Sequence, residues 1–339
     1  MNVLQNYIKK SLSILFLSIF LPLFSIASIV FLIKMATYTA VIQLSLFEMS
    51  KLFFFMLPEL LFYTLPISFF VAATLTLFKL SNDNEIVVIF ALGIKPKFIL
   101  KTLFVPALLL SSILFFNFFV LFPHAKILSN NFLSYKKSEA KFNLSASEFG
   151  HKFGEWLLYI GKDNQNGTYS DVILFNKKLN EEVLVGAKQA QIINDSGVLR
   201  LKLTSGEGYS YSKEKFTQID FKTMFINDTM KTDLDEYQTP LEYWFPNKAS
   251  SKIEKKLITN ILLSLFPLLS LFAIASIGIV HVRHQKGKVY LFLFASIITY
   301  YALAMSLQLV LSFYAIAFLV VGWLGSTYTI YKKNIVAKF

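Results

Sequence analysis

The sequence predicts an α+β membrane protein in which six transmembrane helices, grouped three and three, flank one inserted antiparallel β domain. Hydrophobic residues make up 55% of the 339 residues and charged residues only 16%, against the ~25% charged that is typical of a soluble domain. Three long apolar segments precede a polar stretch, residues 123–256, and three follow it. Period-two alternation within that stretch is typical of β-strands.

Each apolar segment reaches or approaches the ~20 residues that a helix needs to cross a hydrocarbon core. The predicted spans are residues 12–33, 52–78, 98–122, 257–280, 289–311 and 313–331. The first segment is too long for a signal peptide and lacks a clear small-residue cleavage site, so we expect it to remain as the first helix. Residues 1–122 and 257–339 therefore form the two halves of the predicted membrane domain.

The distribution of positive charge predicts the orientation. Fourteen of the 33 Lys and Arg residues lie outside residues 123–256, and twelve of these fall on one side of the bilayer. Only Lys34 and Lys51 fall on the other side. By the positive-inside rule, both termini are expected in the cytoplasm and the central stretch in the periplasm. That stretch has 19 basic and 17 acidic residues, and this near balance argues against nucleic-acid binding.

Within residues 123–256, short alternating runs separated by turn residues predict six to eight antiparallel strands in a jellyroll-like fold, a sandwich or a barrel. In one predicted strand Leu199, Leu201 and Leu203 share one face. Such an apolar face must be buried, either against a second sheet or against a bound lipid chain. The sequence leaves both possibilities open.

The sequence contains no cysteine and only four scattered histidines. We therefore expect no catalytic residue, no metal site and no cofactor. A G-x-x-x-x-G-K-[ST] phosphate loop is absent, because Gly287-Lys288 lacks both the upstream glycine and the following hydroxyl. Any step driven by ATP would need a partner subunit.

Among the cytoplasmic loops, residues 79–101 carry the most specific pattern. Ser81 is placed to cap a short amphipathic helix of about residues 81–95, with carboxylates in its first turn, where the helix dipole favours negative charge. Gly93 is expected to end this helix and Pro96 to start the next. The pattern fits either a capped interfacial helix or a docking helix for a cytoplasmic protein. The candidate docking residues are Asp83, Glu85, Ile86, Ile89, Phe90 and Gly93.

Charged residues and prolines near the outer end of the spans form a second candidate group. Lys34 ends the first span, where its ammonium is placed either to hold an anionic lipid headgroup or to snorkel toward ordinary headgroups. In the second span we expect structural roles for Pro58, Glu59 and Pro66, with Glu59 as a hydrogen-bonding group.

Ten residues of the first membrane half form a combination that is specific as a set. They are Pro58, Glu59, Leu65, Pro66, Lys79, Leu80, Glu85, Ile86, Ala91 and Gly93. This set resembles the LptF/LptG permease family of the lipopolysaccharide export machine, and the resemblance covers nearly the whole chain. The Lys79-Leu80 pair and the basic loop at residues 282–288 resemble LptF more than LptG, although Lys288 stands where the family usually has Arg.

The resemblance implies a permease subunit of an inner-membrane ABC transporter. Such a permease extracts lipopolysaccharide or lipooligosaccharide and passes it to a periplasmic jellyroll bridge protein. The family also implies a paralogous permease subunit and a cytoplasmic ABC ATPase dimer, which would contact the docking helix at Glu85. The chain itself is then not an enzyme.

Two other classes of protein remain as alternatives. A membrane-anchored sensor or assembly scaffold would use a periplasmic β domain to bind a ligand without transport. The hydroxyl-bearing residues of the fifth span favour transport, but they serve equally well in helix packing. A membrane enzyme is the third class, weakened by the lack of an intramembrane acid–base group. Retention of an ATPase during purification separates a transporter from the other two.

Overall fold

The computed structural model describes residues 2–39, 44–141, 149–153, 155–164, 168–178, 181–195, 198–212, 215–227, 237–246, 251–280 and 288–337. The chain divides into two compact units. The helical unit comprises Met1–Met35, Met49–Leu128 and Tyr237–Phe339, and the β unit comprises Ala36–Glu48 and Ser129–Glu236. The β unit is narrower than the polar stretch expected at residues 123–256, because both margins of that stretch belong to the helical unit.

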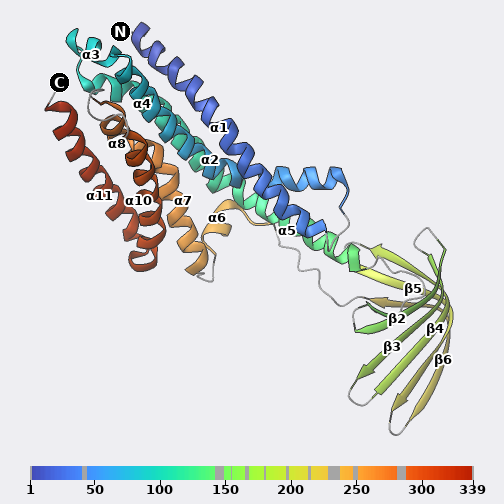
Figure 1. The fold of residues 1–339 in the computed structure, drawn as a ribbon. Coiled ribbons are helices and arrows are strands. Elements are labelled where there is room, and N and C mark those ends of the chain that lie inside the picture. The colour runs from blue at the N-terminus through green and yellow to red at the C-terminus, as the bar shows by residue number, and fades with distance from the viewer. Residues whose placement is uncertain are drawn as a thin grey trace. The chain divides into compact units, whose positions relative to one another are not determined.

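The helices follow the predicted apolar segments (Figure 1). Five helices are long and apolar enough to cross a membrane, or six if the pair α7–α8, bent by 46°, counts as one broken span. The predicted three-plus-three arrangement is confirmed in these terms. The described helices are α1 (Asn2–Thr39), α2 (Leu46–Asn82), α3 (Glu85–Ala91), α4 (Pro96–Phe116), η1 (Asn117–Leu121), α5 (Phe122–Lys141), α6 (Pro240–Trp244), α7 (Ser251–Leu269), α8 (Leu271–Gly278), α10 (Lys288–Leu311), α11 (Tyr314–Tyr331) and η2 (Lys332–Val336).

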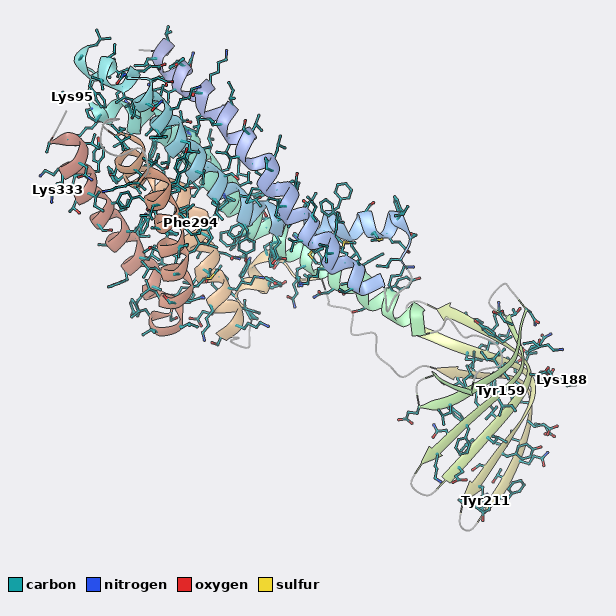
Figure 2. The ribbon with its side chains drawn as sticks, viewed as in Figure 1. Lys95, Tyr159, Lys188, Tyr211, Phe294 and Lys333 are labelled. Carbon is teal, nitrogen blue, oxygen red and sulfur yellow. The ribbon has the colours of Figure 1, made fainter. Side chains whose placement is uncertain are left out.

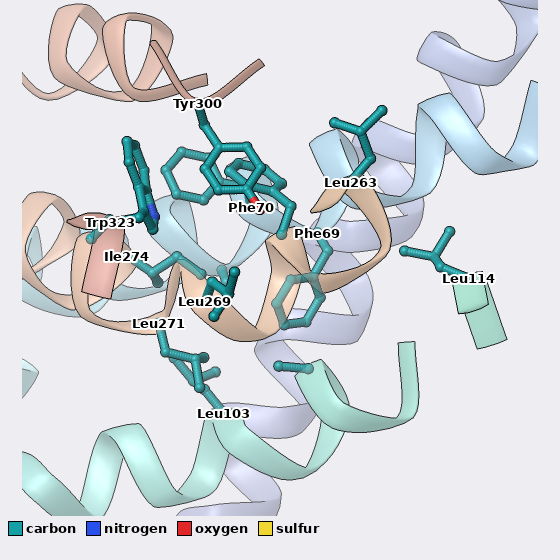
Figure 3. Packing of buried hydrophobic residues seen from close by; sticks show 14 of the residues in the cluster. Phe69, Phe70, Leu103, Leu114, Leu263, Leu269, Leu271, Ile274, Tyr300 and Trp323 are labelled. Carbon is teal, nitrogen blue, oxygen red and sulfur yellow. The ribbon is translucent and has the colours of Figure 1, made fainter. Parts of the chain in front are cut away.

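A ladder of aromatic rings forms the core of the helical unit (Figure 3). Phe70 of α2 lies 5.1 Å from Phe266 of α7, measured between ring centroids. Phe266 lies 4.6 Å from Tyr300 of α10, which lies 5.0 Å from Trp323 of α11. The Tyr300 hydroxyl donates a 2.7 Å hydrogen bond to the carbonyl of Leu262. The ladder therefore joins the spans that precede the β unit in sequence to those that follow it.

Hydroxyl groups inside α2 are satisfied within the helix itself. Five Ser and Thr side chains donate hydrogen bonds of 2.7–2.9 Å to carbonyls four residues earlier. These side chains are Thr64, Ser68, Thr74, Thr76 and Ser81. Because a hydrocarbon core offers no water, a polar group there must find its partner in the protein. The helix can therefore carry these residues through a membrane.

The β unit contains one six-stranded antiparallel sheet, and the inserted β domain is confirmed. The strands pair in sequence order; they are β1 (Phe149–Phe153), β2 (Trp156–Asp163), β3 (Thr168–Lys178), β4 (Glu181–Asp195), β5 (Val198–Ser212) and β6 (Phe216–Asn227). Several are longer than the short strands expected. The described strands pair only with their sequence neighbours, so they form a meander without the crossover pairs of a Greek key.

One face of this sheet is apolar, as alternation predicts. Leu201 and Leu203 are fully buried, together with side chains from β2, β3 and β4, whereas the side chain of Leu199 lies outside the described residues. The alternation changes phase where Asp171 and Ser205 adopt left-handed backbone, with φ of 55° and 51°. The side chains of this apolar face are buried against one another, and all of them come from the one described sheet.

Helices α2 and α8 make a close contact that requires glycine. A Cβ on Gly278 would lie 2.7 Å from both the Thr74 carbonyl oxygen and Leu77 Cβ. The Ser81 hydroxyl oxygen lies 3.0 Å from the Gly278 carbonyl oxygen and 2.9 Å from that of Leu77. Small residues permit such backbone approach between membrane helices.

We therefore expect Gly278→Ala to destabilise the helical unit by about 1–3 kcal/mol, the usual cost of overpacking. The matched control is Gly322→Ala in α11, where nothing lies within 4 Å of the added Cβ. Thermal unfolding of both variants in detergent provides the measurement. Equal melting temperatures for the two variants would contradict the close contact.

Candidate functional site

Helix α3 lies at the end of the helical unit where α1 begins and α11 ends (Figure 1). Asn84, in left-handed conformation with φ of 61°, precedes it, and Glu85 is its first residue. Gly93 has φ of 82°, a conformation that disfavours side chains with a Cβ, and its N–H donates to the Phe90 carbonyl at 2.9 Å. Pro96 begins α4 at its first turn. The structure therefore confirms that Gly93 follows the end of this helix and that Pro96 starts the next one.

The predicted start of this helix is wrong, because α2 continues to Asn82. Ser81 is therefore in the last turn of α2 and does not cap α3. Ser81 is 1% exposed, and its hydroxyl faces the backbone of Gly278 and Val280. Asp83 lies in the turn before α3, and the helix is seven residues long, shorter than the expected range of about 81–95.

The apolar residues of α3 divide into a buried side and an exposed side. Ile86 and Ile89 are 1% and 7% exposed, and Phe90 packs half-buried against the helical core. These three candidate docking residues therefore hold α3 against its own chain. The exposed apolar side consists of Val87, Val88 and Leu92, which are 43%, 57% and 74% exposed. We call these three residues the outer face of α3.

Sequence reasoning missed this outer face. The candidate docking residues Ile86, Ile89 and Phe90 are on the side that faces the core, and Val87, Val88 and Leu92 are not among the predicted residues. The missed signal is that apolar residues occur on every side of so short a helix. A helix that is apolar all round must be covered on all sides, and its own chain covers only one side of α3.

Glu85 is held by a residue 78 positions earlier in the chain. The hydroxyl of Tyr7 in α1 lies 3.0 Å from Glu85 Oε1 and 2.9 Å from Oε2, as a donor to the carboxylate. Next to Tyr7, Ile8 is fully buried in the helical core, as is most of Leu12. Of the side chains described in α1, only those two and Met35 are buried. The first turns of α1 are thus attached to the α3 region while most of the helix faces outward.

The second candidate group lies along α1 and α2. Lys34 is exposed near the end of α1 that is opposite to Tyr7. Pro58 and Pro66 lie inside α2, which continues through both of them. Glu59 is half-buried and interacts electrostatically with Lys256 of α7. The structure therefore brings Glu85 and Asp83 together at one end and leaves Lys34 well separated from them along α1.

Lys256 lies in an aromatic cluster where the chain returns to the helices. Its ammonium lies 4.0 Å from the centroid of the Phe122 ring, a cation–π distance. Phe122 stacks on Trp244, whose indole N–H donates to the Phe119 carbonyl at 3.1 Å. Glu59 also acts electrostatically on this cation, and its expected role as a hydrogen-bonding group stays a prediction. Among the described residues, no group of three or more His, Cys, Asp or Glu could hold a metal ion.

The helices, the inserted sheet and the exposed short helix together define a multi-pass α+β membrane protein with an inserted β domain. The sequence model of the lipopolysaccharide export system permease LptF/LptG family matches residues 6–328. The chain belongs to this family, and the resemblance found in the sequence is confirmed. The protein is accordingly a lipopolysaccharide export permease, a non-catalytic subunit. A search of curated proteins found no matching relative.

The contact between Tyr7 and Glu85 yields a prediction for stability. Hydrogen bonds to charged groups contribute ~1.5–3 kcal/mol, and we expect about 1 kcal/mol here because this contact is exposed to solvent. Tyr7→Phe and Glu85→Gln should therefore show a coupling energy of about that size in a double-mutant cycle, measured by unfolding in detergent. The control cycle pairs Glu85→Gln with Tyr328→Phe in α11. Additive effects of Tyr7→Phe and Glu85→Gln would contradict the contact.

Proposed function

We propose that the chain is the permease subunit of an ABC transporter that extracts lipopolysaccharide or lipooligosaccharide from the inner membrane and passes it to a periplasmic bridge protein. A separate cytoplasmic ATPase dimer supplies the energy, and a paralogous permease completes the pathway. The observation that carries this proposal is the outer face of α3, an exposed apolar surface at the basic end of a lipopolysaccharide export permease.

The orientation is proposed from the positions of the basic residues. Lys95 at the start of α4 and Lys333 in η2 lie at the same end of the helical unit (Figure 2). The first residues of α1, with Lys9 and Lys10, lie at this end too (Figure 1). Cytoplasmic loops are rich in Lys and Arg. This end therefore faces the cytoplasm in the proposal, and α3 is exposed to the ATPase.

The ATPase would bind to the outer face of α3. Fully burying a Val or Leu side chain contributes ~1.5–3 kcal/mol, so three exposed side chains provide a large share of a protein–protein contact. Asp83 and Glu85 add negative charge at the start of the helix, where they can meet cationic groups of the ATPase. The inner residues Ile86 and Ile89 would transmit a push on α3 to the helical core.

Glu85 gives the docking site a connection to α1. When the ATPase moves α3, the hydrogen bond from Tyr7 would carry this movement to the first turns of α1. The most apolar segment of α1 has no fully buried residue, although Phe16 and Ile19 pack against the helical core. Such a helix can shift without disturbing the aromatic ladder. We propose that α1 borders the lipid path together with the paralogous permease.

Lys34 would hold the anionic headgroup of the lipid near the other end of α1. Its ammonium acts as a point charge, and partial desolvation strengthens its attraction to phosphate. The neighbouring residue Ile33 is 64% exposed, as expected for a surface that meets lipid. In the β unit, β6 is an edge of the described sheet and exposes Phe216, Ile219 and Phe225. This edge is available for the periplasmic bridge protein.

Replacing Val88 or Leu92 of the outer face by Asp should weaken ATPase binding at least about tenfold, because each variant loses one buried apolar side chain. The matched control is Leu241→Asp in α6, which is 62% exposed and on the opposite side in the proposed orientation. Binding of the purified ATPase to inside-out vesicles is the measurement. Right-side-out vesicles should not bind it. If the unaltered chain retains no ATPase in either orientation, the sensor or scaffold class is favoured.

Lys34→Asp should impair lipid capture more than fivefold, since one Lys near an anionic surface corresponds to about a factor of five and the substitution reverses the charge. Lys34→Arg should be tolerated, because the charge matters more than the shape. Lys51→Asp, at the second basic residue predicted on this side, serves as the control. Photocrosslinking of lipid from a probe at Ile33 reports capture, and ATPase binding should be unchanged. Equal crosslinking in Lys34→Asp and the unaltered chain would move the headgroup site elsewhere.

A further inference from the structure

A groove between α8, α10 and α11 is not used by the proposed transport path. Its cavity volume is about 420 Å³, within the ~300–1,000 Å³ range of small-molecule sites. Its walls are single helix faces, because the lining residues recur every three or four positions. From α10 these are Val289, Phe292, Ala295, Ser296 and Thr299, and from α11 Trp323, Ser326, Thr327 and Ile330. Ala273, Ser276 and Ile277 of α8 form its floor.

The groove has one polar end and one deep end. Lys288 at the start of α10 and Asn334 in η2 line the polar end. Thr299 of α10 and Trp323 of α11 line the deep end, eleven positions from Lys288 and Asn334 respectively. At 1.5 Å per residue this corresponds to ~16 Å. The polar end is the end where Lys95 and Lys333 also lie (Figure 2). The groove thus runs from a cationic mouth into the membrane-spanning part of the protein.

The walls suit an acyl chain although they include hydroxyl groups. Ser276 donates to the Phe272 carbonyl at 2.7 Å, and Thr327 donates to the Trp323 carbonyl at 2.6 Å. Because these two protons are already bonded within their own helices, an apolar ligand beside Ser276 and Thr327 leaves neither donor unpaired. The buried indole N–H of Trp323, for which no hydrogen-bond partner is found among the described residues, lies at the deep end of the groove. Phe292 is 52% exposed, so the groove is open along α10 to the surrounding lipid.

The charge at the mouth favours an anionic headgroup. Residues 257–339 contain six Lys and Arg residues and no Asp or Glu. Lys288 therefore has no acidic residue from this half of the chain to neutralise it. Asn334 adds a carboxamide that can donate to phosphate oxygens.

We propose that this groove binds an anionic glycerophospholipid, with its phosphate at Lys288 and Asn334 and one acyl chain along Phe292, Ile277 and Ile330. In the proposed orientation this lipid comes from the cytoplasmic leaflet. It is distinct from the transported lipid, whose headgroup is assigned to Lys34 at the other side of the membrane. The bound lipid would brace the start of α10 and the end of α11 near α3.

Trp323 provides a probe inside the groove. The purified chain is reconstituted in phosphatidylcholine vesicles free of lipopolysaccharide, and brominated phosphatidylglycerol or brominated phosphatidylcholine is added. Subtracting the fluorescence quenching measured in Trp323→Phe from that measured in the unaltered chain gives the quenching of Trp323 alone. We expect about fivefold stronger binding of the anionic lipid, the preference that one lysine provides near a membrane surface. Excess inorganic phosphate should not displace it, because the acyl chain contributes to binding.

Two variants separate this site from ordinary surrounding lipid. Lys288→Gln should abolish the preference, whereas Lys97→Gln, an exposed lysine of α4 at the same end, should leave it unchanged. Ala295→Phe should fill the groove and reduce the quenching by both lipids. Equal quenching by the two lipids in the unaltered chain, or an unchanged preference in Lys288→Gln, would overturn the proposal. Neither result depends on lipid export or on the ATPase.

Discussion

The contact between Phe70 and Phe266 is the interaction on which the helical unit depends. These rings belong to helices on opposite sides of the β insertion in sequence, and Tyr300 and Trp323 extend their contact across two more helices. In a bilayer, apolar side chains gain little by leaving lipid, so close packing and internal hydrogen bonds must hold helices together. The ladder supplies the packing, and the Tyr300 hydroxyl supplies the hydrogen bond.

With the ladder in place, the end of the helical unit that carries α3 can be both anchored and exposed. Ser81 and Gly278 bring α2 and α8 into contact beneath α3. Ile86 then holds α3 against this rigid base, while Val88 remains free for a partner. A docking helix needs this combination, because a force applied to a loosely held helix would be lost in local motion. Gly93 completes the arrangement by turning the chain directly into α4.

Helix α1 differs from the other long helices in how it is attached to the helical unit. Its buried side chains are few, and Tyr7 joins it to Glu85 at one end. The same carboxylate is therefore both a candidate contact for the ATPase and an internal ligand for α1. A partner cation at Glu85 would compete with Tyr7 or strengthen the link by adding to it. Either outcome would couple α3 to the helix that carries Lys34, without requiring any movement of the aromatic core.

The sequence by itself determined the membrane class, the inserted β domain and the family. These features depend on long-range composition, on period-two alternation and on a set of motif residues, all of which are properties of the chain as written. It also placed Gly93 and Pro96 correctly, because backbone conformation at glycine and proline is a local property. The positions of Leu201 and Leu203 in the buried face of the sheet followed from alternation alone.

Only the tertiary structure decided which side of α3 is exposed. Ile86 and Val88 are both apolar and two positions apart, and burial is chosen by neighbours that come from distant segments. Ser81 could have capped α3, but contact with Gly278 made it the last turn of α2. The contact of Tyr7 with Glu85 spans 78 positions and leaves no periodic signal. Such features depend on packing between segments, and no local pattern in one sequence encodes them.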